Sequence, residues 1–165
     1  MKLLEFQAKN IFKRYNIPVP SFGYIVKSQE ELSNVLRNVK TPCVLKAQVL
    51  AGRRGKAGGV RVAQTITEVP KLVNEILNLK INNEKVHAVL IEEFIDVAKE
   101  FYTSIAIDTT TNNIIAMASP LGGIDVEELL QKYPEKIYKV NIDPFIGLRP
   151  YEGRLLAKKI GLSGK

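Results

Sequence analysis

The sequence predicts an α+β protein in which helices alternate with β-hairpins. Apolar residues recur with helical spacing in several segments, and short β-branched runs occur in pairs joined by polar or glycine-rich turns. The predicted order is α-β-α-β-β-α-β-β-β-α-β-α, which lacks the regular strand–helix alternation of a doubly wound parallel sheet. The 165 residues are enough for one domain or two small lobes.

The first half of the chain is expected to contain three helices. The first covers residues 4–15, where apolar side chains share one face, and the extended connector Pro18–Pro20 follows it. The segment Ser28–Glu31 is a capping box that opens the second helix. The third begins at Thr67, with Pro70 in its first turn, where proline is tolerated. The strands between them are expected over residues 22–26, 43–49, 60–63 and 87–95.

The second half is expected to begin with a hairpin and to end with a helix. The strands Phe101–Asp108 and Ile114–Ser119 flank a polar turn. A helix capped by Asp125 follows, then the strand Ile137–Ile142, and Pro150 opens the last helix. One face of the first strand is predicted to carry Phe101, Thr103, Ile105 and Ile107.

Composition narrows the class of protein. There is no apolar run near 18 residues, so no transmembrane helix is expected. The single cysteine, Cys43, excludes an internal disulfide framework and suits the reducing cytoplasm or mitochondrial matrix. A net charge of +7 favours anionic partners: a nucleotide, a nucleic acid or an acidic protein face.

The segment Gly52–Arg61 is the strongest candidate for a binding site. It holds four glycines and four cations between two predicted strands, and Lys46 lies on the first of these. Glycine allows close backbone approach, and exposed N–H groups beside cations form an anion cradle. The segment is neither a P-loop nor a dinucleotide fingerprint. Two interpretations stay open: a phosphate-binding loop, or a mobile surface hairpin with Lys46 at a strand edge.

Two further constellations have a functional and a structural interpretation. Glu92 and Glu93 end an apolar strand and point to opposite faces, so at most one can face a cleft; both could also be solvated. The pair Gly122–Gly123 precedes a helix and either binds an anion or forms a plain turn. His87 has no second His or Cys near it, which argues against a metal site.

Several motifs, in order along the whole chain, closely resemble the N-terminal ATP-grasp region of succinyl-CoA synthetase β subunits (ADP-forming). They are Glu5–Lys9, Lys46–Gln48, Gly52–Val60, Ala98–Glu100, Gly122–Glu128 and Asp143–Pro144. The resemblance implies an ATP-grasp fold over residues 1–165, in which two α+β lobes clamp a nucleotide. The inserted lobe would be about residues 21–98, and the second lobe residues 1–20 plus 99–165.

The resemblance also implies which residues bind the nucleotide. In the family pattern, Lys46 contacts the phosphates and the glycine loop closes over them, while other residues line the adenosine pocket. Pro20 is typical of ATP-using members. The implied ligands are Lys46, Arg53, Arg54 and Gly55 for the phosphates, and Glu92, Ile95 and Glu100 for adenosine.

The implied function is part of an ADP-forming succinate–CoA ligase. The full enzyme would convert ATP, succinate and CoA to ADP, phosphate and succinyl-CoA through a phosphohistidine on a partner α subunit. The family's Mg²⁺ ligands and its CoA-ligase domain lie beyond residue 165, so a fragment without catalytic residues of its own is expected.

Three alternatives remain open from the sequence. A related ligase could act on malate, acetate or citrate, and a remnant could bind nucleotide without chemistry. A non-catalytic module could bind nucleic acid through residues 52–61. The absence of tryptophan and of an aromatic set beside the loop argues against the last, because base stacking would be poorly served.

Overall fold

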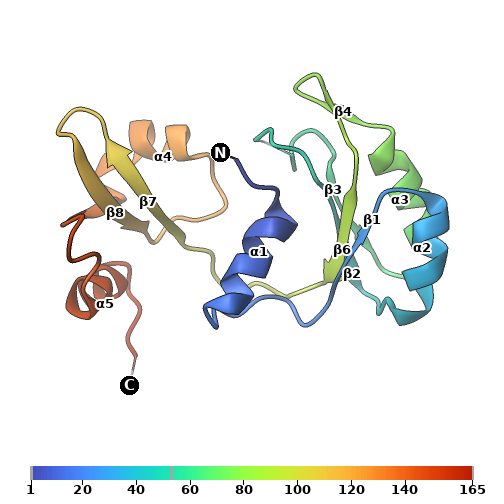
Figure 1. Ribbon diagram of the computed structural model, residues 1–165, viewed down its shortest axis with the longest axis horizontal. Coiled ribbons are helices and arrows are strands. Elements are labelled where there is room, and N and C mark those ends of the chain that lie inside the picture. The colour runs from blue at the N-terminus through green and yellow to red at the C-terminus, as the bar shows by residue number, and fades with distance from the viewer. Residues whose placement is uncertain (1, 53, 165) are drawn as a thin grey trace. The chain divides into compact units, whose positions relative to one another are not determined.

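The computed structural model describes residues 2–52 and 54–164 (Figure 1). The chain is α+β, as predicted, and it forms two compact units, Met1–Asp96 and Val97–Lys165, called the first and second units below. We expected residues 1–20 to belong with the second lobe. In the structure they form part of the first unit. No helix in the described residues is long and apolar enough to cross a membrane.

The first unit is built on an antiparallel sheet of strand order β1-β6-β2-β3. Its strands are β1 Gly23–Val26, β2 Cys43–Ala47, β3 Val60–Ala63 and β6 Val89–Glu93. Its helices are α1 Glu5–Arg14, α2 Gln29–Val35 and α3 Val69–Leu77. A small hairpin, which we did not predict, pairs β4 Lys80–Ile81 with β5 Glu84–Lys85.

The two faces of this sheet have different surroundings. Figure 1 shows α2 and α3 on one face and α1 on the other. Alternate residues of β2, namely Cys43, Leu45 and Ala47, are fully buried in the core beneath α2 and α3. Burial of Leu45, the largest of the three, contributes roughly 1.5–3 kcal/mol. The core therefore fixes the register of β2 and turns Val44 and Lys46 toward the face of α1.

The second unit contains a three-stranded antiparallel sheet of order β7-β8-β9. Its elements are β7 Tyr102–Asp108, β8 Asn113–Ser119, α4 Val126–Lys132, β9 Tyr138–Ile142 and α5 Pro150–Lys159. Leu156 of α5 and the following Ile160 pack against Ala116, Ala118 and Ile142.

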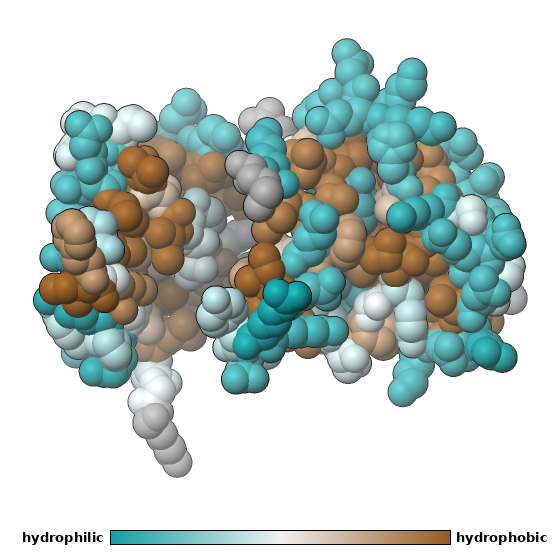
Figure 2. Space-filling model, in the orientation of Figure 1, coloured by the Kyte–Doolittle hydropathy of each residue, from teal (hydrophilic) through white to brown (hydrophobic). Residues whose placement is uncertain are grey.

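One expected face of the second unit is not covered. Ile105 pairs with Ala116 and therefore shares the face on which α5 packs. Ile105 and Ile107 are nevertheless 66% and 70% exposed, and apolar surface is visible over β7 and β8 in Figure 2. In the core, α5 packs against β8 and β9. The alternation of β7 therefore predicts which side chains share a face, but it does not predict whether another element covers that face.

The remaining differences from the predicted elements lie at their ends. β2 stops at Ala47 and β6 covers only Val89–Glu93, because the pairing of these two strands with each other spans only those residues. The third helix begins at Val69, after a short 3₁₀ turn over Ile66–Glu68, with Pro70 in its first turn as predicted. Ser28 caps α2 by accepting a hydrogen bond from the Glu31 N–H.

Candidate functional site

The candidate site lies on the face of the first sheet that carries α1, opposite α2 and α3. Strand register places Val44 opposite Glu92 and Val62, and Lys46 opposite Leu90 and Val60. These side chains share one face, because paired residues of neighbouring strands point the same way. Val60 and Val62 are 37% and 40% exposed, so they leave apolar surface beside the charged groups. The sequence predicted these valines as strand residues but gave them no role.

The charged groups form a closed ring of alternating sign. Lys46 contacts Glu92 and lies 3.2 Å from Glu5, while Lys9 lies 2.5 Å from Glu92 and 2.8 Å from Glu5. Arg54 Nη2 adds a third cation 2.9 Å from Glu5 Oε2. Glu92 itself is only 3% exposed. Lys46, Arg54 and Glu92, all candidates from the sequence, therefore belong to one cluster with Glu5, to which we assigned no role.

The charges of the ring shift the pKa values of Glu5 and Lys46. Burial raises the pKa of Glu5, but the hydrogen bond from Lys9 and the charges of Lys46, Lys9 and Arg54 outweigh it and lower that pKa to about 2. Burial lowers the pKa of Lys46, but its contacts with Glu92 and Glu5 outweigh this and hold the pKa above the ordinary value. Both groups are therefore charged at neutral pH.

This shift predicts an acid-sensitive contribution to stability. The folded-state pKa of Glu5 lies below its ordinary value of 4.5, so the unfolded chain binds the proton more readily. The stabilisation by Glu5 is present above about pH 4.5 and is lost as the pH falls toward about 2. Urea unfolding at pH 5 and pH 3 should show a larger loss for the wild type than for Glu5→Gln. Equal losses would contradict the role of Glu5.

The glycine loop is anchored at its base. Arg54 Nη1 donates to the Ala47 carbonyl at 3.0 Å, and the Gly59 N–H donates to the Arg54 carbonyl at 2.8 Å. Gly59 has no room for a side chain, because an added Cβ would lie 2.7 Å from Ile81 Cδ1. Gly55 is exposed at the tip. Arg53, which we also predicted to bind phosphate, lies outside the described residues.

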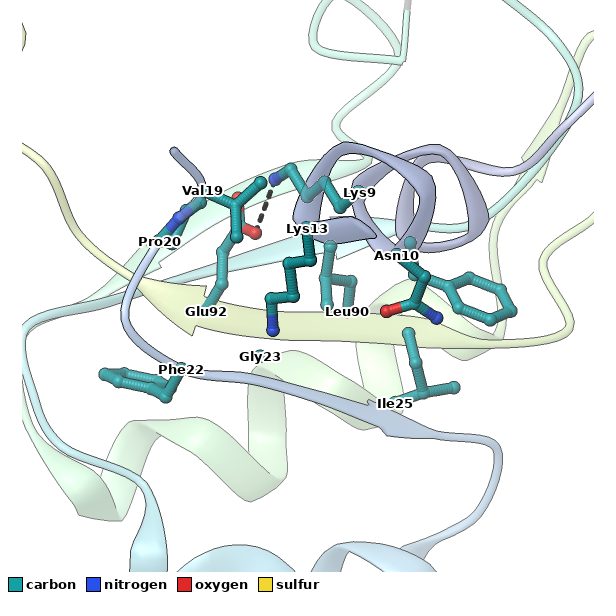
Figure 3. Close-up of a pocket in the computed structure, with 11 residues that line it drawn as sticks. Lys9, Asn10, Lys13, Val19, Pro20, Phe22, Gly23, Ile25, Leu90 and Glu92 are labelled. Carbon is teal, nitrogen blue, oxygen red and sulfur yellow. Dashed lines mark hydrogen bonds and ion pairs between the residues drawn. The ribbon is translucent and has the colours of Figure 1, made fainter. Parts of the chain in front are cut away.

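A cavity of about 150 Å³ lies beside the ring, between α1 and strands β1 and β6 (Figure 3). Figure 3 shows Lys9 and Lys13 reaching from α1 toward these strands, with the Lys9–Glu92 ion pair above β6. Pro20, Phe22 and Leu90 supply apolar lining. Glu92 thus connects the cavity to the charged ring.

Glu93 is the second acid at the end of β6, and Ile95 and Glu100 are the other two predicted adenosine ligands. Glu93 points to the opposite face from Glu92 and accepts the Ser21 N–H at 2.7 Å, a bond that lowers the pKa of Glu93. Ile95 is 51% exposed just after β6, in the first unit. Glu100 belongs to the second unit.

The double glycine of the second unit packs against Glu100. The Gly122 N–H donates to the Glu100 carbonyl at 3.2 Å. Gly123 has φ +72°, and an added Cβ would lie 2.1 Å from Glu100 Oε2. A carboxylate therefore already occupies the space beside Gly123. Of the two interpretations of Gly122–Gly123, the structure supports a turn that requires close approach, and it gives no support for an external anion.

Cys43 does not form a reactive thiol site. Cys43 is buried, and burial, with the nearby Glu68 charge, raises the pKa of its thiol, which keeps it in the unreactive neutral form. Among the described residues, no group of three or more His, Cys, Asp or Glu side chains could hold a metal ion.

Comparison with known families assigns the fold to one class of protein domain. Residues 2–165 match the family described as the ATP-grasp domain. The chain therefore belongs to the ATP-grasp family.

Curated proteins that are similar to this chain include β subunits of succinate–CoA ligases. The ADP-forming subunit of Staphylothermus marinus is 47% identical over 162 residues, which are 98% of this chain and 42% of that protein. A GDP-forming subunit of Thermus thermophilus is 41% identical over 99% of this chain and 43% of its own length. This chain thus spans less than half the length of these relatives.

Solved structures show the same fold. A dinucleotide-forming acetyl-coenzyme A synthetase of Candidatus Korarchaeum cryptofilum, in complex with coenzyme A and Ca-AMPCP, is 25% identical, with a TM-score of 0.73. The match covers 99% of this chain and 71% of that one. PH1788 from Pyrococcus horikoshii also has a TM-score of 0.73 but is 21% identical, so it supports the fold alone.

Proposed function

We propose that this chain is the nucleotide-binding part of an ADP-forming succinate–CoA ligase β subunit. The observation that carries the proposal is the cluster of Lys46, Arg54 and Glu92 on the sheet face that carries α1, beside an anchored glycine loop. The relatives that cover nearly the whole chain support it, because they are ADP- or GDP-forming succinate–CoA ligase β subunits.

Lys46 and Arg54 would bind the phosphates. Both are partly exposed, with side-chain exposures of 25% and 26%, so each can reach a ligand without leaving its present contacts. Cations fixed in advance around a transferring phosphoryl group stabilise its charge without reorganisation. Arg53 and Gly55 would complete the loop over the phosphates. The whole protein would also use Mg²⁺, CoA, succinate and an α subunit with the phosphorylated histidine, in the cytoplasm or mitochondrial matrix.

The nucleoside would be held by Glu92, Ile95 and Glu100. We favour ATP over GTP because this chain has Pro20, which is typical of the ATP-using members of the family that it resembles. Overall similarity does not decide this preference, since relatives of both kinds align with nearly the whole chain. A ligase for malate, acetate or citrate stays an alternative within the same class.

Calorimetric titration of this chain with AMP, ADP, ATP and GTP tests the proposal. We expect affinity to rise with each added phosphate, because each meets Lys46 or the loop cations, and ATP to bind more tightly than GTP. Titration with single-stranded RNA at rising salt is the counter-test. Tight RNA binding with a steep salt dependence, and no nucleotide binding, would favour the basic-module alternative.

A further inference from the structure

We propose that Glu5 of α1 is a positioning residue that holds Lys46 and Arg54 side by side for a polyphosphate. This inference rests on the proposed function, since it assigns a task to Glu5 within the same site. It goes further because no phosphate ligand is expected on α1, and a carboxylate does not itself bind phosphate.

Glu5 occupies the point where two separate segments meet. Its Oε1 lies 3.2 Å from Lys46 Nζ on β2, and its Oε2 lies 2.9 Å from Arg54 Nη2 in the glycine loop. The other carboxylate of the ring, Glu92, contacts Lys46 and Lys9. Through its ion pair with Arg54, Glu5 links the glycine loop to the ring.

The two cations keep donors for a ligand while Glu5 holds them. An ammonium has three N–H donors and a guanidinium has five. The contacts of Lys46 are to Glu92 and Glu5, and those of Arg54 are to the Ala47 carbonyl and Glu5. Without the negative charge of Glu5, the positive charges of Lys46 and Arg54 would repel each other. The glycine loop would also lose the ion pair that connects Arg54 to α1.

α1 depends on polar contacts to keep Glu5 in place. The helix has no buried residue, so apolar packing alone does not fix its position. Gln48, which is 2% exposed, accepts the Phe6 N–H at 3.2 Å and donates to the Lys46 carbonyl at 3.0 Å. Gln48 therefore fastens the first turn of α1 to β2, next to the lysine that Glu5 contacts.

The test compares ATP and AMP binding to this chain in Glu5→Gln and Glu5→Asp. Gln keeps the size of the side chain but loses the charge. Asp keeps the charge but is one methylene shorter, which prevents it from spanning both cations. Each variant would misplace at least one of the two cations, and one hydrogen bond from a charged group corresponds to roughly tenfold or more in affinity, so we expect both variants to lose roughly tenfold or more in ATP affinity. AMP affinity should change little, because AMP carries one phosphate.

Glu30→Gln is the matched control, because Glu30 is an exposed acid in the first turn of α2 in the same unit. It should leave both affinities unchanged. Unchanged ATP affinity in the two Glu5 variants would overturn the inference and leave the proposed function standing. Equal losses for ATP and AMP would also overturn it, because they would show a structural role alone. Failure of the wild type to bind ATP would overturn the proposed function itself.

Discussion

Lys46→Ala is expected to lower the affinity of this chain for ATP by about 10- to 100-fold. A hydrogen bond from a charged group contributes roughly 1.5–3 kcal/mol, and each 1.4 kcal/mol corresponds to a factor of about ten. Lys46 would make such bonds to phosphate, and its contacts with Glu92 and Glu5 hold its pKa above the ordinary value. If the proposed function holds, the same change in the complete protein should abolish MgATP-dependent acid–CoA ligation.

Titration calorimetry on the chain and a turnover assay on the complete protein measure the two effects. Lys80→Ala is the control, since Lys80 is an exposed lysine on β4 of the same unit, outside the ring. Thermal unfolding shows whether the variant is folded, because removal of Lys46 leaves the buried Glu92 with Lys9 as its remaining cation in the ring. Near-normal turnover in a folded Lys46→Ala variant would contradict the assignment of Lys46 as a phosphate ligand.

The sequence predicts the first sheet well because its signals are local. The alternation of β2 buries Cys43, Leu45 and Ala47, and the same alternation places Lys46 on the other face. The turn residues and caps, such as Ser28, act within a few residues of where they stand in the chain. Element types therefore follow from the sequence, while their ends depend on pairing partners far away in the chain.

The charged ring is less predictable because it is assembled from distant segments. Glu5 and Glu92 are 87 positions apart in the sequence, yet both contact Lys46. An acid in the first turn of a helix is already explained by the helix dipole, so Glu5 gave no separate signal. Arg54 was predicted to close over a ligand, and its contacts with Ala47 and Glu5 emerge only in the fold.

The exposed isoleucines of β7 also show that tertiary packing is not predictable from a local pattern. Ile105 and Ile107 have the alternation of a buried face, but α5 packs over β8 and β9. Periodicity specifies which side chains share a face, and only tertiary packing decides whether another element covers it.

Gly122→Ala is expected to destabilise the second unit and to displace Glu100. An added Cβ would lie 2.6 Å from the Glu100 carbonyl carbon and 2.7 Å from the Phe101 nitrogen, and neither backbone atom can move aside alone. Overpacking of this kind costs about 1–3 kcal/mol. In a domain of this size, each kcal/mol lowers the Tm by roughly 4–8 °C.

Gly153→Ala in α5 is a matched control with the opposite expected sign. Nothing lies within 4 Å of its added Cβ, and alanine in a helix is more stable than glycine by roughly 0.5–1 kcal/mol. Calorimetric melting of both variants measures the difference, and hydrogen exchange in β7 and β8 locates it. Because Glu100 is a proposed adenosine ligand, Gly122→Ala should also weaken AMP binding, whereas Gly153→Ala should not. A Gly122→Ala variant that melts like the wild type would show that the close approach of Gly122 to Glu100 is not required by the fold.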